Sequence, residues 1–134
     1  MSFLRCSGGG GLDLTIPKRG LFIAVKNRPN ANSGGYWGMI FKLSALEDDM
    51  TFTITAVTAK TIAAVFVRAQ SDLSGTTQGT NRAIYAYNAQ LTVATITGAQ
   101  IKSTLSAAEL STYPYVALDF SCYSGSGLFT FEIS

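Results

Sequence analysis

The chain has 134 residues, enough for one domain that buries a hydrophobic core without help from metals or disulfides. Only 13% of the residues are charged and 47% are hydrophobic, whereas soluble globular proteins average about 25% charged residues. The net charge of +2 is too small to indicate a nucleic-acid partner, so we expect none.

No segment has the character of a membrane or export signal. The longest apolar run, 62–67, is far shorter than the about 18 residues of a membrane-spanning helix. The first residues also lack the apolar stretch of a secretory signal. We therefore expect synthesis in a cytoplasm and no membrane insertion.

The charges are unevenly distributed along the chain. Residues 1–42 contain six basic residues and one acidic residue, whereas the remainder contains four basic and seven acidic residues. A basic first part and an acidic second part suit head-to-tail contacts between copies of the chain. Scattered, solvated charges are the alternative interpretation.

The N-terminal segment contains four consecutive glycines, Gly8, Gly9, Gly10 and Gly11. A phosphate-binding loop would require a Lys and a following helix, but here an alternating apolar segment follows. We therefore predict a flexible arm over residues 1–11 and a single domain over 12–134. Phe3, Leu4 and Arg5, together with the glycines, are candidate contacts to a neighbouring subunit.

Alternation of apolar and polar residues predicts strands along most of the chain. In chain order, the predicted strands cover 12–16, 21–25, 36–43, 50–56, 61–68, 84–88, 91–96, 116–122 and 129–133. The segments 84–88 and 91–96 are predicted to form a hairpin. The segment 61–68 is apolar on both faces, so both of its sides need cover.

One short helix is predicted near 103–110, because Ser106 and Glu109 have the spacing of a capping box. About nine short strands and a single short helix indicate an all-β fold. Uneven strand lengths and a long loop at 71–81 favour a two-sheet antiparallel β-sandwich of jelly-roll or immunoglobulin-like type. The two cysteines, Cys6 and Cys122, are too few for a disulfide framework.

The chain contains no histidine, the commonest general base and metal ligand. Catalytic triads and Cys-His pairs are therefore excluded. Two carboxylates are enough for glycoside hydrolysis, and Asp119 and Glu132 lie in strands predicted to be neighbours. Carboxylates on outward strand faces more often face solvent and prevent aggregation. We therefore predict a non-enzymatic protein without catalytic residues or a cofactor.

An acidic turn contains Glu47, Asp48 and Asp49. These carboxylates could hold a calcium ion if backbone carbonyls joined them, but the EF-hand spacing is absent. We expect a solvated turn and no metal site.

Aromatic residues provide another candidate site. Tyr36, Trp37, Tyr85 and Tyr87 could form a surface on which sugar rings stack. Glycines on both sides of the Tyr36–Trp37 pair would let a ligand or another backbone come close. The alternative for Trp37 is a place in the core as its largest side chain.

Three stretches give the chain a resemblance to known proteins: "RCSGGGGL", "MTFTITAVTAKTIAAVFVRA" and "LSAAELSTYPYVALDFSCYSGSGLFTFEIS". With them, the chain resembles the small β-sandwich structural proteins of tailed-phage virions, namely capsid decoration proteins and head-fibre or tail-fibre modules. The resemblance implies a virion component, made in the host cytoplasm, that forms homo-oligomers and docks on other virion proteins. A carbohydrate-binding adhesin module that uses the aromatic residues is the alternative, with a cell-surface glycan as partner.

Overall fold

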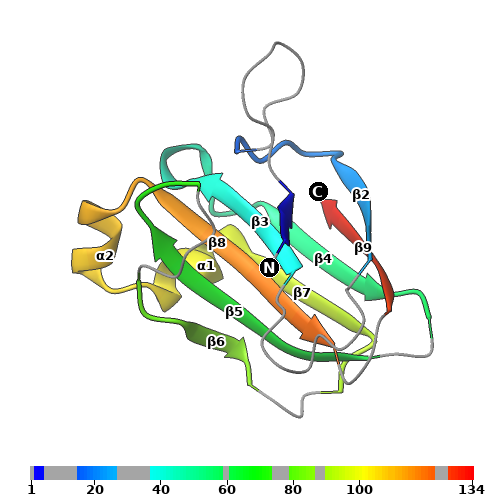
Figure 1. Ribbon diagram of the computed structural model, residues 1–134. Helices are drawn as coiled ribbons and strands as arrows, with labels where there is room; N and C mark the ends of the chain where they lie inside the picture. Colours follow the sequence, from blue (N-terminus) through cyan, green and yellow to red (C-terminus); the bar gives the residue numbers. More distant parts are fainter. Residues whose placement is uncertain are drawn as a thin grey trace.

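The computed structural model describes residues 2–4, 15–26, 37–58, 61–73, 79–86, 90–122 and 127–134, with the backbone alone at 2–4, 26 and 37 (Figure 1). Its strands form two sheets packed face to face, which confirms the predicted all-β two-sheet sandwich. We call the five-stranded layer sheet A and the four-stranded layer sheet B.

Sheet A has the order β1-β3-β8-β5-β6. Its strands are β1 (Ser2–Leu4), β3 (Trp37–Lys42), β8 (Tyr115–Cys122), β5 (Ile62–Gln70) and β6 (Arg82–Tyr85). All neighbours within it are antiparallel except β1, which runs parallel to β3.

Sheet B has the order β2-β9-β4-β7 and is antiparallel throughout. Its strands are β2 (Phe22–Lys26), β9 (Leu128–Ile133), β4 (Thr51–Ala56) and β7 (Val93–Thr97). The predicted strand at 12–16 lies mostly outside the described residues. Its last two residues, Thr15 and Ile16, form a turn instead, in which the Thr15 carbonyl accepts a 2.7 Å hydrogen bond from the Lys42 amide.

The core lies between the two sheets and is built by alternate residues of each strand. Aromatic rings pack across it: the Phe41 and Phe52 centroids are 5.4 Å apart, and those of Phe120 and Phe129 are 5.0 Å apart. Four inward residues of β8 are buried in this core, as the alternation predicts: Val116, Leu118, Phe120 and Cys122. β5 is buried along its whole length, which confirms that both of its faces are covered.

Two short helices close one end of the sandwich, where the sequence predicts one helix near 103–110 (Figure 1). They are α1 (Gly98–Thr104) and α2 (Ala107–Thr112), separated by the extended residues Leu105 and Ser106. The capping box of Ser106 and Glu109 is present at the start of α2. A second capping box, formed by Thr97 and Gln100, starts α1 and explains why helical structure begins earlier than predicted.

The hairpin predicted for 84–88 and 91–96 is wrong, because β6 and β7 belong to different sheets. Between them, Leu91 forms an isolated bridge with Ile62 of β5, and the chain then continues into sheet B. β7 pairs with β4, so that Ala94 and Ile96 enter the core from the opposite side. Alternation shows which residues point inward, but both sheets face the same core, so it does not distinguish between them.

Candidate interaction surface

The two carboxylates considered for hydrolysis are not assembled into a site. Asp119 lies in β8 of sheet A, whereas Glu132 lies in β9 of sheet B, so the prediction that they occupy neighbouring strands is wrong. The outward, solvent-facing position fits Glu132, which is exposed, but Asp119 is completely buried. The full width of the core separates the two strands.

Asp119 is buried because a cation lies beside it on the same sheet. Arg68 of β5 donates a hydrogen bond from Nη1 to Asp119 Oδ2, and both side chains are almost fully shielded from solvent. Arg68 Nε also donates to Gln70 Oε1 at 3.2 Å. The sequence contains one signal for this pair, namely two opposite charges in the middle of strongly apolar strands. A buried charge requires such a partner.

Gly38 of β3 makes room for this carboxylate. A Cβ added at Gly38 would lie 2.7 Å from Asp119 Oδ1 and 2.0 Å from the Leu118 carbonyl oxygen. Of the two expectations for the glycines beside Trp37, a nearby ligand or a nearby backbone, Gly38 fits the second, because it permits the close approach of β8. Among the described residues, Asp119 Oδ1 and Ser121 Oγ have no hydrogen-bond partner.

Burial raises the pKa of Asp119 to about 7. The positive charge of Arg68 and the hydrogen bond that it donates act in the opposite direction and lower this pKa. A carboxyl group with such a pKa can act as a general acid only when substrate reaches it. Asp119 has no exposed surface, so its role is structural.

The acidic turn forms ion pairs rather than a ligand cluster. Asp49 accepts a hydrogen bond from Arg19, Glu47 lies 4.0 Å from the same guanidinium, and Asp48 accepts from Lys102 Nζ at 2.8 Å. In the described part of the chain, no three His, Cys, Asp or Glu side chains are grouped so that they could hold a metal ion.

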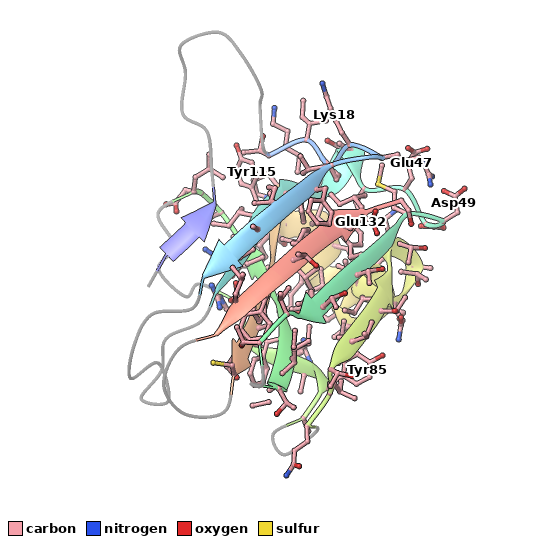
Figure 2. The ribbon with its side chains drawn as sticks, turned by 90° about the vertical axis from the view of Figure 1, so that its right-hand side faces the viewer. Lys18, Glu47, Asp49, Tyr85, Tyr115 and Glu132 are labelled. Atoms are coloured by element: carbon pink, nitrogen blue, oxygen red, sulfur yellow. The ribbon has the colours of Figure 1, made fainter. Side chains whose placement is uncertain are left out.

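Of the four candidate stacking aromatics, only Tyr85 has a described side chain. It is half-buried, and its hydroxyl donates a 3.1 Å hydrogen bond to the carbonyl of Thr95 in β7 (Figure 2). Tyr36 and Tyr87 lie outside the described residues, and Trp37 is described by its backbone alone. Both positions considered for the Trp37 side chain, in the core or facing a ligand, therefore stay predictions.

The candidate contact residues of the arm are only partly described. Phe3 and Leu4 belong to β1, where their backbones pair with Gly38 and Met39. Arg5, Gly8, Gly9, Gly10 and Gly11 lie outside the described residues.

The described side chains on the outer face of sheet B are exposed or half-buried and nearly all uncharged (Figure 2). The register places its residues in two rows that each cross four strands: Phe22, Glu132, Thr53, Thr95, and Ala24, Thr130, Thr55, Val93. Phe22 is 60% exposed and Val93 is 47% exposed. Glu132 is the one charged member of these rows.

The two sheets thus differ in how their outer faces meet solvent. On sheet A, the outward residues of β5 and β8, such as Phe66, Arg68 and Asp119, are buried. On sheet B, the described outward side chains of all four strands are exposed or half-buried. The outer face of sheet B is therefore the candidate interaction surface.

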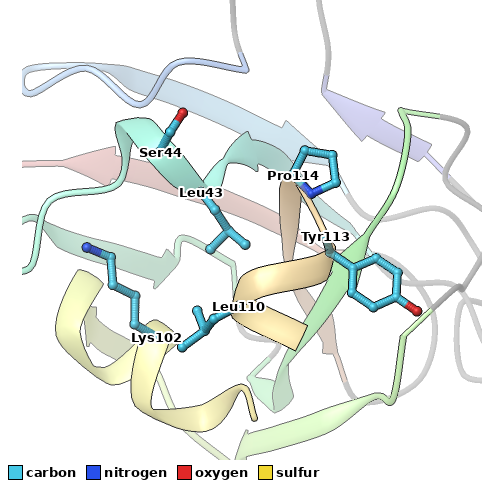
Figure 3. A pocket seen from close by; sticks show the side chains of 6 residues that line it. All are labelled: Leu43, Ser44, Lys102, Leu110, Tyr113 and Pro114. Carbon is cyan, nitrogen blue, oxygen red and sulfur yellow. The ribbon is translucent and has the colours of Figure 1, made fainter. Parts of the chain in front are cut away.

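A separate hollow of about 350 Å³ lies between the turn η2 (Leu43–Ala45) and the two helices (Figure 3). Its lining is formed by Leu43, Ser44, Lys102, Leu110, Tyr113 and Pro114. The Lys102 ammonium is bound to Asp48, and the Tyr113 hydroxyl points away from Leu43 and Leu110. The polar groups of the lining therefore do not converge on one point, as those of a specific small-molecule site do.

Comparisons with protein-family models, with curated proteins and with solved structures find no match for this chain. Within the described residues, none of the helices is both long and apolar enough to cross a membrane.

Proposed function

We propose that the chain is a non-enzymatic structural component of a virion, as a capsid decoration protein or as a head-fibre, tail-fibre or adaptor component. It acts by self-assembly and by docking on other virion proteins. The outer face of sheet B is the docking surface. The observation that carries this proposal is that two rows of mainly threonine and apolar side chains, exposed or half-buried, cross all four strands of this sheet.

The physical properties of this face suit contact with protein. A face with a single charged residue in its two rows loses little free energy when water leaves it, and threonine hydroxyls can form hydrogen bonds to a partner at the same time. The rest of the chain offers little for catalysis: it has no histidine, and its candidate carboxylates lie in opposite sheets. The resemblance to phage β-sandwich proteins supports the choice of a virion as the assembly.

The proposal is tested by the presence of the chain in virus particles. We expect antibody labelling in electron micrographs and a constant copy number per particle in quantitative mass spectrometry. Thr53→Arg should remove the chain from the particles, because it places a long cation in the middle of the proposed docking surface. Particles that lack the wild-type chain would overturn the proposal.

Thr112→Arg is the matched control, since Thr112 is an exposed threonine at the end of α2. This variant should enter particles like the wild type. Circular dichroism melting of both variants shows whether each is folded. If both variants enter particles equally, the docking surface does not lie on sheet B.

A further inference from the structure

Among the described residues, the β2 edge of sheet B has backbone groups that are open to pairing. The amide of Ile133 in β9 donates to the carbonyl of Leu21, the residue before β2. Because the direction alternates along a strand, Ile23 and Val25 of β2 also direct their backbone groups toward β9. The N–H and C=O groups of Phe22, Ala24 and Lys26 therefore point the other way, away from the sheet. Within the described chain, Phe22 and Ala24 have no hydrogen-bond partner on that side.

The opposite edge of sheet B, formed by β7, is partly engaged. Hydrogen bonds from Ala56 to Thr92 and from Gly98 to Met50 show that Thr95 and Thr97 direct their backbone groups outward. The Thr95 carbonyl accepts from the Tyr85 hydroxyl, and the Thr97 amide donates to Gln100 Oε1. Such covering is how proteins prevent unwanted pairing at a sheet edge.

We infer that β2 pairs antiparallel with β2 of a second copy of this chain, which joins two B sheets into one sheet of eight strands. This inference rests on the proposed structural function and names one partner within it. A head-to-tail array would need the β7 edge, where the Thr95 carbonyl and the Thr97 amide are already bound, whereas pairing of two β2 edges uses only open backbone groups. Contact between identical edges produces a closed dimer with two-fold symmetry.

The outward residues determine the register of this pairing. With Ala24 on the two-fold axis, Phe22 pairs with Lys26 of the partner subunit, and about six backbone hydrogen bonds form. Glu132 lies beside Phe22 in the same row. This register puts the basic Lys26 position of the partner subunit in the same row as the acidic Glu132, and opposite charges in one row favour it.

The area of contact determines how tight the dimer is. Pairing along one short strand buries much less than the about 800 Å² per partner of a stable interface. The dimer is therefore weak in solution and depends on concentration. In an assembly, neighbouring contacts would strengthen it by raising the effective concentration.

The test places charges on the two-fold axis. Ala24 is exposed, so Ala24→Lys and Ala24→Glu should keep the fold. Each variant alone brings like charges together and should dimerise at least about tenfold more weakly than the wild type. An equimolar mixture of the two variants should restore dimerisation as a heterodimer. Sedimentation equilibrium up to about 1 mM measures this, because weak dimers have dissociation constants in that range.

Ala107→Lys and Ala107→Glu are matched controls on the exposed face of α2 and should dimerise like the wild type. The inference is overturned if the wild type stays monomeric up to the highest concentration, if the Ala24 variants dimerise as well as it does, or if their mixture shows no recovery. A monomer that still enters virus particles would overturn this inference and leave the proposed function standing. A dimer that is absent from particles would do the reverse.

Discussion

Asp119 shows how a single residue can tie the stability of the fold to pH. Its carboxyl group is buried beside Arg68, and burial raises its pKa from 3.8 to about 7. The folded protein therefore holds this proton at pH values where the unfolded chain has released it. The free energy of unfolding must then fall as pH rises between these two pKa values.

The corresponding variant is Asp119→Asn, which removes the titration. Relative to this variant, the wild type should lose stability as pH rises from about 4 to about 7 and change little above that range. Urea unfolding at several pH values measures the difference. If the difference in free energy of unfolding between the wild type and Asp119→Asn stays constant over this pH range, or grows in favour of the wild type, Asp119 is ionised throughout the range.

Glu109→Gln provides a control of the opposite sign. The hydrogen bond from the Ser106 backbone amide is the main cause that lowers the pKa of Glu109. The stability that this carboxylate contributes is present above the unfolded pKa of about 4.5 and is lost as pH falls below it. Relative to Glu109→Gln, the wild type should lose stability as pH falls below about 4.5, whereas relative to Asp119→Asn it should lose stability as pH rises from about 4 to about 7.

Two leucines in different surroundings test the position of the core. Leu118 is completely buried in β8, whereas Leu128 in β9 is 37% exposed. Leu118→Ala should lower the free energy of unfolding by about 2 to 5 kcal/mol, because it leaves a cavity. Leu128→Ala should cost clearly less, because the site borders solvent. Equal losses in urea unfolding would contradict the described arrangement of the two sheets.

At the scale of elements, β1 is the strand with the weakest connection to the domain. It pairs with β3 through three residues and runs parallel to it at the edge of sheet A. Within the described residues, β3 is its one pairing partner.

Deletion of residues 1–11 should therefore leave cooperative unfolding intact while weakening incorporation into virus particles. The first result follows from the small contribution of β1 to the sheet, and the second from the predicted role of the arm. Thermal unfolding and particle copy number measure the two effects separately. Loss of the folded state would show that β1 is an essential part of sheet A.

The helices and the β6–β7 connection show which elements local sequence can predict. The capping box at Ser106 correctly marks the start of α2, because its hydrogen bonds join residues only three apart. The false hairpin at 84–96 has the opposite cause. Its strands have suitable patterns, but their true partners, β5 and β4, lie far away in the chain.

At the scale of the whole molecule, the two outer faces differ in exposure, because the central strands of sheet A are buried on both sides and the strands of sheet B alternate. Sheet A carries a buried ion pair on its outer side, and sheet B presents an exposed face with one open edge. This asymmetry is the basis of the proposed docking surface. It is also the basis of the inferred self-association through β2, because the β7 edge is partly engaged by Tyr85 and by the capping box of α1.

The sequence by itself determined the class of fold, most of the strands and the inward residues of the core. These properties depend on alternation and on local turn and cap signals, which act over a few residues. It also excluded histidine-dependent catalysis, because composition alone decides that point.

Only the tertiary structure decided which strands share a sheet, where Asp119 lies and which edge stays open. Arg68 and Asp119 are 51 positions apart, and the burial of each depends on the other. Pairing of distant strands is decided by the packing of the whole core, in which every inward position looks alike from the sequence. The separation of Asp119 from Glu132 and the exposure of Phe22 on β2 both follow from that packing.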